Sequence, residues 1–85
     1  MLIGLNEALT SIILNLAEGN GRYSEQDHRR FLDIAEGSVV KAAAYLDLAV
    51  QKSILSRAET GPGKHLLERI LAMLSRMEGL KTGQG

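Results

Sequence analysis

The stretch FLDIAEGSVVKAAAYLDLAV, residues 31–50, carries the pattern that sets the architecture of this chain. Its apolar residues recur at intervals of three and four, which is the period of an amphipathic helix. One line of them, the first seam, contains Leu32, Ala35, Val39, Ala42, Leu46 and Ala49. A neighbouring line, the second seam, contains Phe31, Ile34, Ser38, Tyr45 and Leu48, with Lys41 interrupting it. Two seams make a wide apolar face, so we expect this helix to contact two or more other helices.

This long helix is predicted to cover about residues 24–53. Ser24 is a favourable N-cap, and Asp27 stands three residues later in the position of a capping-box acid. Gly37 lies in the middle of the helix, where glycine costs ~1 kcal/mol relative to alanine. We interpret Gly37 as a sign that a neighbouring backbone approaches closely there.

Shorter helices are predicted on both sides of the long one. Apolar residues spaced alternately by three and four positions precede it: Leu2, Leu5, Leu9, Ile12 and Leu16. They predict a helix over about 2–18 that ends at Gly19. After the long helix, the sequence TGPG at 60–63 predicts a loop over 56–63. A third helix then follows over about 64–78.

Composition limits the class of protein. The 85 residues allow one domain, which we assign to 1–80, with a polar, disordered tail at 81–85. Cysteine is absent, so neither disulfides nor Cys-based zinc sites form. Ten basic side chains balance ten acidic ones, unlike the basic surplus typical of nucleic-acid binders. No apolar stretch approaches the roughly 20 residues of a membrane span, and no signal peptide is recognisable. We therefore expect a cytoplasmic protein without membrane contact.

The predicted helix lengths do not balance. A long helix with two apolar seams needs more cover than two shorter helices supply. The missing cover is expected from a fourth helix outside this chain or from another subunit, so the pattern favours self-association.

Three segments resemble one known family: SIILNLAEGNGR at 11–22, FLDIAEGS at 31–38 and YLDLA at 45–49. They are similar to the four-helix-bundle proteins encoded by intervening sequences in bacterial 23S ribosomal RNA genes. The accessory variability proteins of diversity-generating retroelements belong to the same broad family. The residues that carry the structural motif here are Ser11, Asn15, Glu18, Gly19, Gly21, Arg22, Ser24, Phe31, Gly37 and Ser38.

The resemblance implies an all-α, four-helix up-down bundle that often assembles as a ring-shaped homopentamer. Some members of the family bind nucleic acid through a basic surface, and the retroelement members also engage a reverse transcriptase. The family usually has a helix ahead of the Ser-Ile motif, whereas this sequence has only ten residues before Ser11. The resemblance therefore implies three helices in this chain, with the first family helix absent.

Two further departures concern charge. Many members carry a basic pair directly before the Ser-Ile motif, where this sequence has NEALT at 6–10. This substitution weakens the case for nucleic-acid binding. Lys41 stands near the place where the long helix of the family usually carries a glutamate, so the polar contact of that glutamate is in doubt.

Polar residues of the motif share one face of the first helix. Asn15 and Glu18 are three positions apart, and Ser11 lies one turn earlier. They form either a polar site between helices or a structural network. We favour the second, in which Asn15, Glu18 and Ser24 satisfy backbone groups and Arg22 in the turn. Glu18→Ala is then expected to lower the thermal stability.

Catalytic and metal-binding patterns are not recognisable in the sequence. His28 and His65 stand outside any known metal motif, and we predict both to be surface or boundary residues. Asp33 and Glu36 lack the Glu-x-x-His partners of a carboxylate metal site in a bundle. We therefore predict no enzyme activity, no cofactor and no metal.

Basic residues around the start of the long helix form the one candidate nucleic-acid site. Arg22, Arg29 and Arg30 are the candidate phosphate contacts, although Glu25 and Asp27 are interleaved with them. Two functions remain open. One is an oligomeric bundle that binds RNA or DNA weakly as an accessory factor, with contacts multiplied by assembly. The other is a purely structural bundle whose partner is another protein or only itself.

Overall fold

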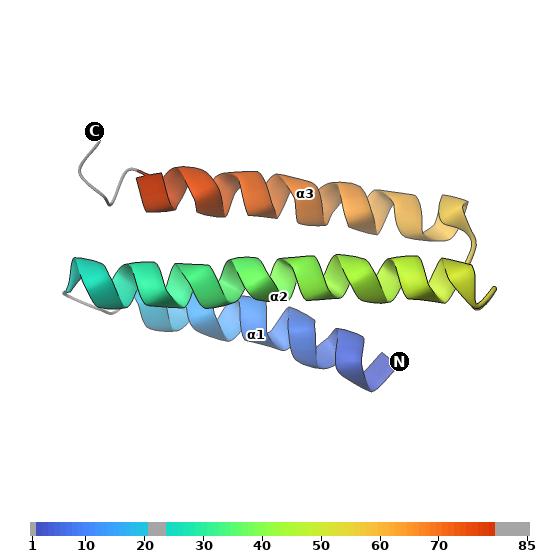
Figure 1. Cartoon of the computed structure of the whole chain (residues 1–85), viewed down its shortest axis with the longest axis horizontal. Coiled ribbons are helices and arrows are strands. Elements are labelled where there is room, and N and C mark those ends of the chain that lie inside the picture. The colour runs from blue at the N-terminus through green and yellow to red at the C-terminus, as the bar shows by residue number, and fades with distance from the viewer. Residues whose placement is uncertain (1, 21–23, 80–85) are drawn as a thin grey trace.

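The computed structural model describes residues 2–20 and 24–79 as three helices (Figure 1). They are α1 (Leu2–Asn20), α2 (Glu25–Gln51) and α3 (Arg57–Gly79). The longest helix, α2, runs antiparallel to both others and packs against each of them. The prediction of an all-α protein with three helices in this chain is confirmed. The predicted tail at 81–85 lies outside the described residues.

The core lies where α1 and α3 meet α2. No Cα atom of α1 comes within 8 Å of one in α3 among the residues that the structure describes, so the backbones of these two helices each approach α2 more closely than one another. The buried apolar side chains of this core come from all three helices: Ala8, Ile12, Leu32, Ala35, Val39, Ala42, Leu67 and Leu74. No helix in the described part of the chain is long and apolar enough to cross a membrane.

The first seam of α2 is covered within a single chain. Leu32, Ala35, Val39 and Ala42 are each no more than 2% exposed. Here α1 and α3 approach the seam from two sides and shield it, so the shortage of cover predicted for the two-seam face does not arise at the first seam. In the second seam, Phe31, Ser38 and Tyr45 are partly buried, whereas Ile34 and Leu48 stay exposed.

Both ends of α2 are capped. The Ser24 hydroxyl oxygen accepts a hydrogen bond from the Asp27 backbone N–H at 3.3 Å, which confirms the predicted N-cap. At the other end Ser53 has a φ of 60°, a left-handed conformation that stops the helix. The backbone N–H of Ile54 then reaches back to the carbonyl of Ala49 at 2.8 Å. The helix ends at Gln51, two residues before the predicted end.

The start of α3 corrects the predicted loop at 56–63. Ser56 Oγ accepts from the Glu59 N–H at 3.1 Å, and Glu59 Oε1 accepts from the Ser56 N–H at 2.8 Å. This reciprocal capping box starts the helix at Arg57 rather than near residue 64. Pro62 consequently lies inside α3, in its second turn. The signal Ser-x-x-Glu was present in the sequence, but the Gly-Pro-Gly run obscured it.

Glycines on α1, rather than Gly37, mark the close approaches between helices. A Cβ added to Gly37 would meet nothing within 4 Å, so the interpretation of a neighbouring backbone there is wrong. A Cβ on Gly4 would overlap the ring of Tyr45, and one on Gly19 would lie 3.2 Å from the Phe31 Cβ. Gly19 is buried and helical, so α1 continues to Asn20 instead of ending at Gly19 as predicted.

Candidate interaction surfaces of the bundle

A chain of hydrogen bonds joins α1 to α2 at the level of the motif. Asn15 Nδ2 donates to the Ser11 carbonyl at 2.8 Å and to Ser11 Oγ at 3.1 Å. Ser11 Oγ lies 2.7 Å from Ser38 Oγ, and Ser38 Oγ donates to the Ile34 carbonyl at 3.0 Å. Each hydroxyl has one proton, so the Ser11 hydroxyl donates to Ser38. The four groups thus form one directed chain across the helix contact.

His28 ties the start of α2 to the end of α1. Its ring is buried, and Nδ1 lies 3.0 Å from the Gly19 carbonyl oxygen. A carbonyl only accepts, so Nδ1 carries the proton in this contact. The prediction of a surface or boundary position is wrong for His28. It holds for His65, whose exposed ring lies 3.8 Å from Glu68.

The described motif residues are concentrated along the contact between α1 and α2. Ser11, Asn15, Gly19, Phe31 and Ser38 all take part in the contacts above. The other motif residues behave differently or are not described. Ser24 caps α2, Gly37 is exposed, Glu18 is exposed, and Gly21 and Arg22 lie outside the described residues. The effect of Glu18→Ala stays a prediction.

The outward side of α1 is unusually apolar. Five large apolar side chains are exposed there, and together they define the α1 outer face: Leu2, Ile3, Leu9, Ile13 and Leu14. Glu7 and Glu18 are the only charged residues of α1, and both are exposed. The inward side of α1 is also apolar, so large apolar side chains lie on both the inward and the outward side of this helix.

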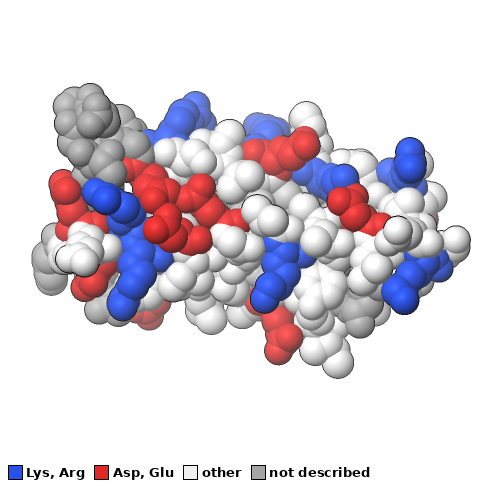
Figure 2. Space-filling model, viewed as in Figure 1, with Lys and Arg blue, Asp and Glu red and all other residues white. Residues whose placement is uncertain are grey.

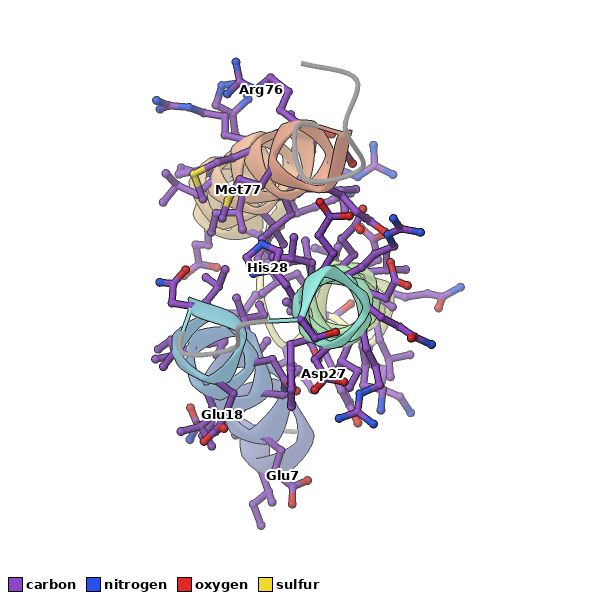
Figure 3. All side chains as sticks on the ribbon, turned by 90° about the vertical axis from the view of Figure 1, so that its left-hand side faces the viewer. Glu7, Glu18, Asp27, His28, Arg76 and Met77 are labelled. Atoms are coloured by element: carbon purple, nitrogen blue, oxygen red, sulfur yellow. The ribbon has the colours of Figure 1, made fainter. Side chains whose placement is uncertain are left out.

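A second exposed apolar surface runs along α3. This α3 groove is shallow and is lined by Leu66, Arg69, Ile70, Ala72, Met73 and Arg76. Leu66 and Met73 are exposed in it, with the two arginines beside them. Seen end-on, Arg76 points away from the bundle at one side, while Glu7 and Glu18 lie at the opposite side (Figure 3). The acidic residues of α1 and Arg76 of α3 therefore lie on opposite sides of the bundle.

The two predicted phosphate contacts that the structure describes, Arg29 and Arg30, do not project from the same side of α2. Arg22 lies outside the described residues, and Arg29 and Arg30, although exposed, are consecutive and so point about 100° apart on the helix. The Arg30 guanidinium lies 4.0 Å from Asp27 Oδ1 and 5.0 Å from the centre of the Phe31 ring. On the face drawn in Figure 2, Lys and Arg are interleaved with Asp and Glu.

Three carboxylates converge where the end of α3 meets α2. Atoms of Asp33, Glu36 and Glu78 lie within 4.8 Å of one another, and the Ser75 hydroxyl donates to Glu36 Oε2 at 3.0 Å. Hydrogen bonds to Glu36 and then Asp33, with partial burial and the two nearby charges, raise the pKa of Glu78 from 4.5 to about 8. Such a cluster could hold a cation, but a shared proton satisfies it equally well.

The sequence analysis considered Asp33 and Glu36 as a possible carboxylate site but did not include Glu78, the third carboxylate of the cluster. Glu78 approaches them only because α3 folds back along α2, and no local spacing shows that contact. The same holds for His28, whose partner is on another helix. No sequence signal available within either segment would have identified these pairs.

The described residues form an antiparallel all-α bundle. In this bundle the motif residues Ser11, Asn15 and Gly19 of α1 lie along the contact with the long central helix α2. The family model described as "23S rRNA-intervening sequence protein" matches residues 4–76. This chain belongs to that family. No curated protein and no solved structure matches the chain. The relation to retroelement accessory proteins stays a prediction.

Proposed function

We propose that this chain is a non-enzymatic, cytoplasmic bundle protein that assembles with further copies of itself through the α1 outer face. The observation that carries the proposal is the exposure of Leu2, Ile3, Leu9, Ile13 and Leu14 on a helix that is already apolar on its inward side. Exposed apolar surface gathered on one helix in this way is typical of interaction sites.

The energetic argument favours cover by a partner. Full burial of one leucine or isoleucine side chain is worth about 1.5–3 kcal/mol. Five such side chains line the α1 outer face, so even partial cover outweighs much of the entropic cost of association. The first seam of α2 contributes nothing to this argument, because it is already covered within the chain.

The test is the mass of the protein in solution, measured by sedimentation equilibrium across a range of concentrations. We expect a mass above that of one chain for the wild type. Leu14→Lys should weaken association at least tenfold, because it removes one buried leucine. Val40→Lys is the matched control, since Val40 on α2 and Leu14 on α1 are both 58% exposed.

A single-chain mass for the wild type at all concentrations would contradict the proposal. Equal weakening by the Val40 variant would instead mean that the α1 outer face has no special part in assembly. Lysine is a good helix former, so both variants should keep their helical content, which circular dichroism checks.

Weak binding of RNA or DNA is the second candidate function. It is supported by the exposed side chains of Arg29 and Arg30 near the start of α2. The Asp27 carboxylate lies beside Arg30 and lowers the positive potential there, which weakens the case for nucleic-acid binding. Binding of a labelled RNA should weaken steeply with salt and fall in the double variant Arg29→Ala with Arg30→Ala. Lys52→Ala with Arg57→Ala is the charge-matched control, and no binding at low salt would remove this candidate.

A further inference from the structure

We infer that a pocket between α2 and α3 binds a small polyol phosphate, a molecule of the sugar phosphate class. The pocket has a volume of about 550 Å³ and lies at the end of the bundle where α2 ends and α3 begins (Figure 1). Its polar lining side chains are those of Asp47, Gln51, Arg57, Thr60 and Lys64. The described lining residues all belong to α2 or α3, so the inference goes beyond the proposed self-association and does not depend on it.

Helical spacing brings these polar groups to one place. Asp47 and Gln51 are four positions apart, so they share one side of α2. Arg57, Thr60 and Lys64 follow one another at intervals of three and four, so they share one side of α3. The Lys64 Nζ donates to Asp47 Oδ1 at 2.6 Å and joins the two sets. The two polar sides therefore meet at the pocket.

The hydrogen-bond donors of the pocket match a phosphate group. Within the described part of the chain, no carboxylate oxygen lies within 4.0 Å of the Arg57 guanidinium, so this charge remains for an anion. Lys64 gives one of its N–H groups to Asp47, which leaves two for a ligand. The forked guanidinium and the ammonium group together suit the three terminal oxygens of a phosphate monoester.

The acceptors and the volume of the pocket indicate the rest of the ligand. Asp47 uses Oδ1 for Lys64, so its Oδ2 can accept from a hydroxyl group, and the Gln51 amide both donates and accepts. Pockets that enclose whole organic molecules measure roughly 300–1,000 Å³, a range that includes this one and far exceeds a bare phosphate ion. The matching ligand is therefore a phosphate carried by a small polyol.

Gly61 leaves part of the pocket wall without a side chain. It lines the pocket, and a Cβ added to it would meet nothing within 4 Å. Gly61→Leu should therefore fold, gain helix propensity and occupy space that the ligand needs. Gly37→Leu is the matched control, because a Cβ on Gly37 also meets nothing within 4 Å and Gly37 lies outside the pocket.

Isothermal titration calorimetry with ribose 5-phosphate tests the site. The wild type and Gly37→Leu should bind it with equal affinity, whereas Gly61→Leu should bind it roughly tenfold more weakly or not at all. Arg57→Gln removes the charge at similar size and should also weaken binding roughly tenfold. Arg69→Gln is its control, because Arg69 is an exposed arginine of α3 outside the pocket. Circular dichroism verifies that all four variants fold.

Amide chemical shifts in NMR spectra locate the ligand. Shift changes that centre on Thr60 and Gly61 support the inference, and changes that centre on α1 or on the α3 groove overturn it. It is also overturned if millimolar ribose 5-phosphate gives neither binding heat nor shift changes, or if Gly61→Leu binds as tightly as the wild type. Equal affinity for inorganic phosphate would overturn the assignment of a polyol. The mass in sedimentation tests self-association separately, so either proposal can fail while the other stands.

Discussion

The hydroxyl oxygens of Ser11 on α1 and Ser38 on α2 lie 2.7 Å apart, and this contact continues through Asn15 on one side and Ile34 on the other. Each single change, Ser11→Ala or Ser38→Ala, should lower the free energy of unfolding by about 1 kcal/mol. The double variant should lose less than the sum, because either change already breaks the shared bond. Urea unfolding followed by circular dichroism measures all four corners of the cycle, and strict additivity would contradict the directed chain.

Gly37 and Gly19 should respond in opposite directions to the same substitution. Gly37→Ala is expected to stabilise the protein by about 1 kcal/mol, because the added methyl group meets nothing and glycine is unfavourable within a helix. Gly19→Ala gains the same helix propensity but presses on the Phe31 Cβ at 3.2 Å, so it should be destabilising overall.

Thermal unfolding of the two glycine variants beside the wild type gives the comparison directly. If Gly37→Ala instead weakens assembly in sedimentation while stabilising the single chain, a second copy must approach that position. A lower stability of the Gly37 variant at concentrations where the protein is monomeric would refute the account of an open site.

Loss of the capping box at the start of α3 is expected to cause local fraying of that helix. Ser56→Ala removes the acceptor for the Glu59 N–H and should cost about 1 kcal/mol of helix stability. The backbone N–H and then the hydroxyl of Ser56 hold the pKa of Glu59 below its usual value. The cap should therefore weaken as the pH falls through that lowered pKa, since protonation removes the charge that accepts the Ser56 N–H.

Amide hydrogen exchange measures this fraying residue by residue. In Ser56→Ala, protection should fall in the turn before Pro62 and stay unchanged beyond Leu67. The N-cap variant Ser24→Ala is the matched control at the start of α2 and should leave α3 unaffected. Equal protection of α3 in the wild type and Ser56→Ala would contradict the assigned start of the helix.

The raised pKa of Glu78 predicts that the protein loses stability at mildly alkaline pH. Its pKa is about 8 in the folded protein and 4.5 as an ordinary carboxyl, so the folded state holds the proton more tightly. The stabilisation is complete below about pH 4.5 and is lost as the pH rises through about 8. Glu78→Gln keeps a hydrogen-bond donor without a titrating charge, so it should exceed the wild type in stability at pH 9.

Glu68→Gln provides the control for this pH dependence, because Glu68 is an exposed acid on the same helix. Melting temperatures between pH 5 and 9 should fall for the wild type and for Glu68→Gln. The fall should be smaller for Glu78→Gln, by the equivalent of about 0.5–1 kcal/mol after solvent screening. Parallel curves for all three proteins would show that the cluster does not share a proton.

Local pattern was sufficient for the helices and for the buried seam. The three-and-four spacing from Leu32 to Ala49 identified the side chains that α1 and α3 cover, because helical periodicity places them on one face. Ser24 was identifiable as a cap for a similar reason, since its hydrogen bond closes within three residues. The wrong start of α3 came from weighing Pro62 above a capping signal that was also local.

Burial and long-range partners required the three-dimensional arrangement. Gly37 was misinterpreted, and His28 was placed on the surface. Each depends on which helix lies opposite, and spacing along one helix carries no information about its neighbours. The sequence alone thus specified where the helices form and which face of each is apolar, because those properties arise within a few turns. The packing of α1 and α3 against α2 then decided which apolar faces are shielded and which remain exposed, because burial depends on contacts between helices.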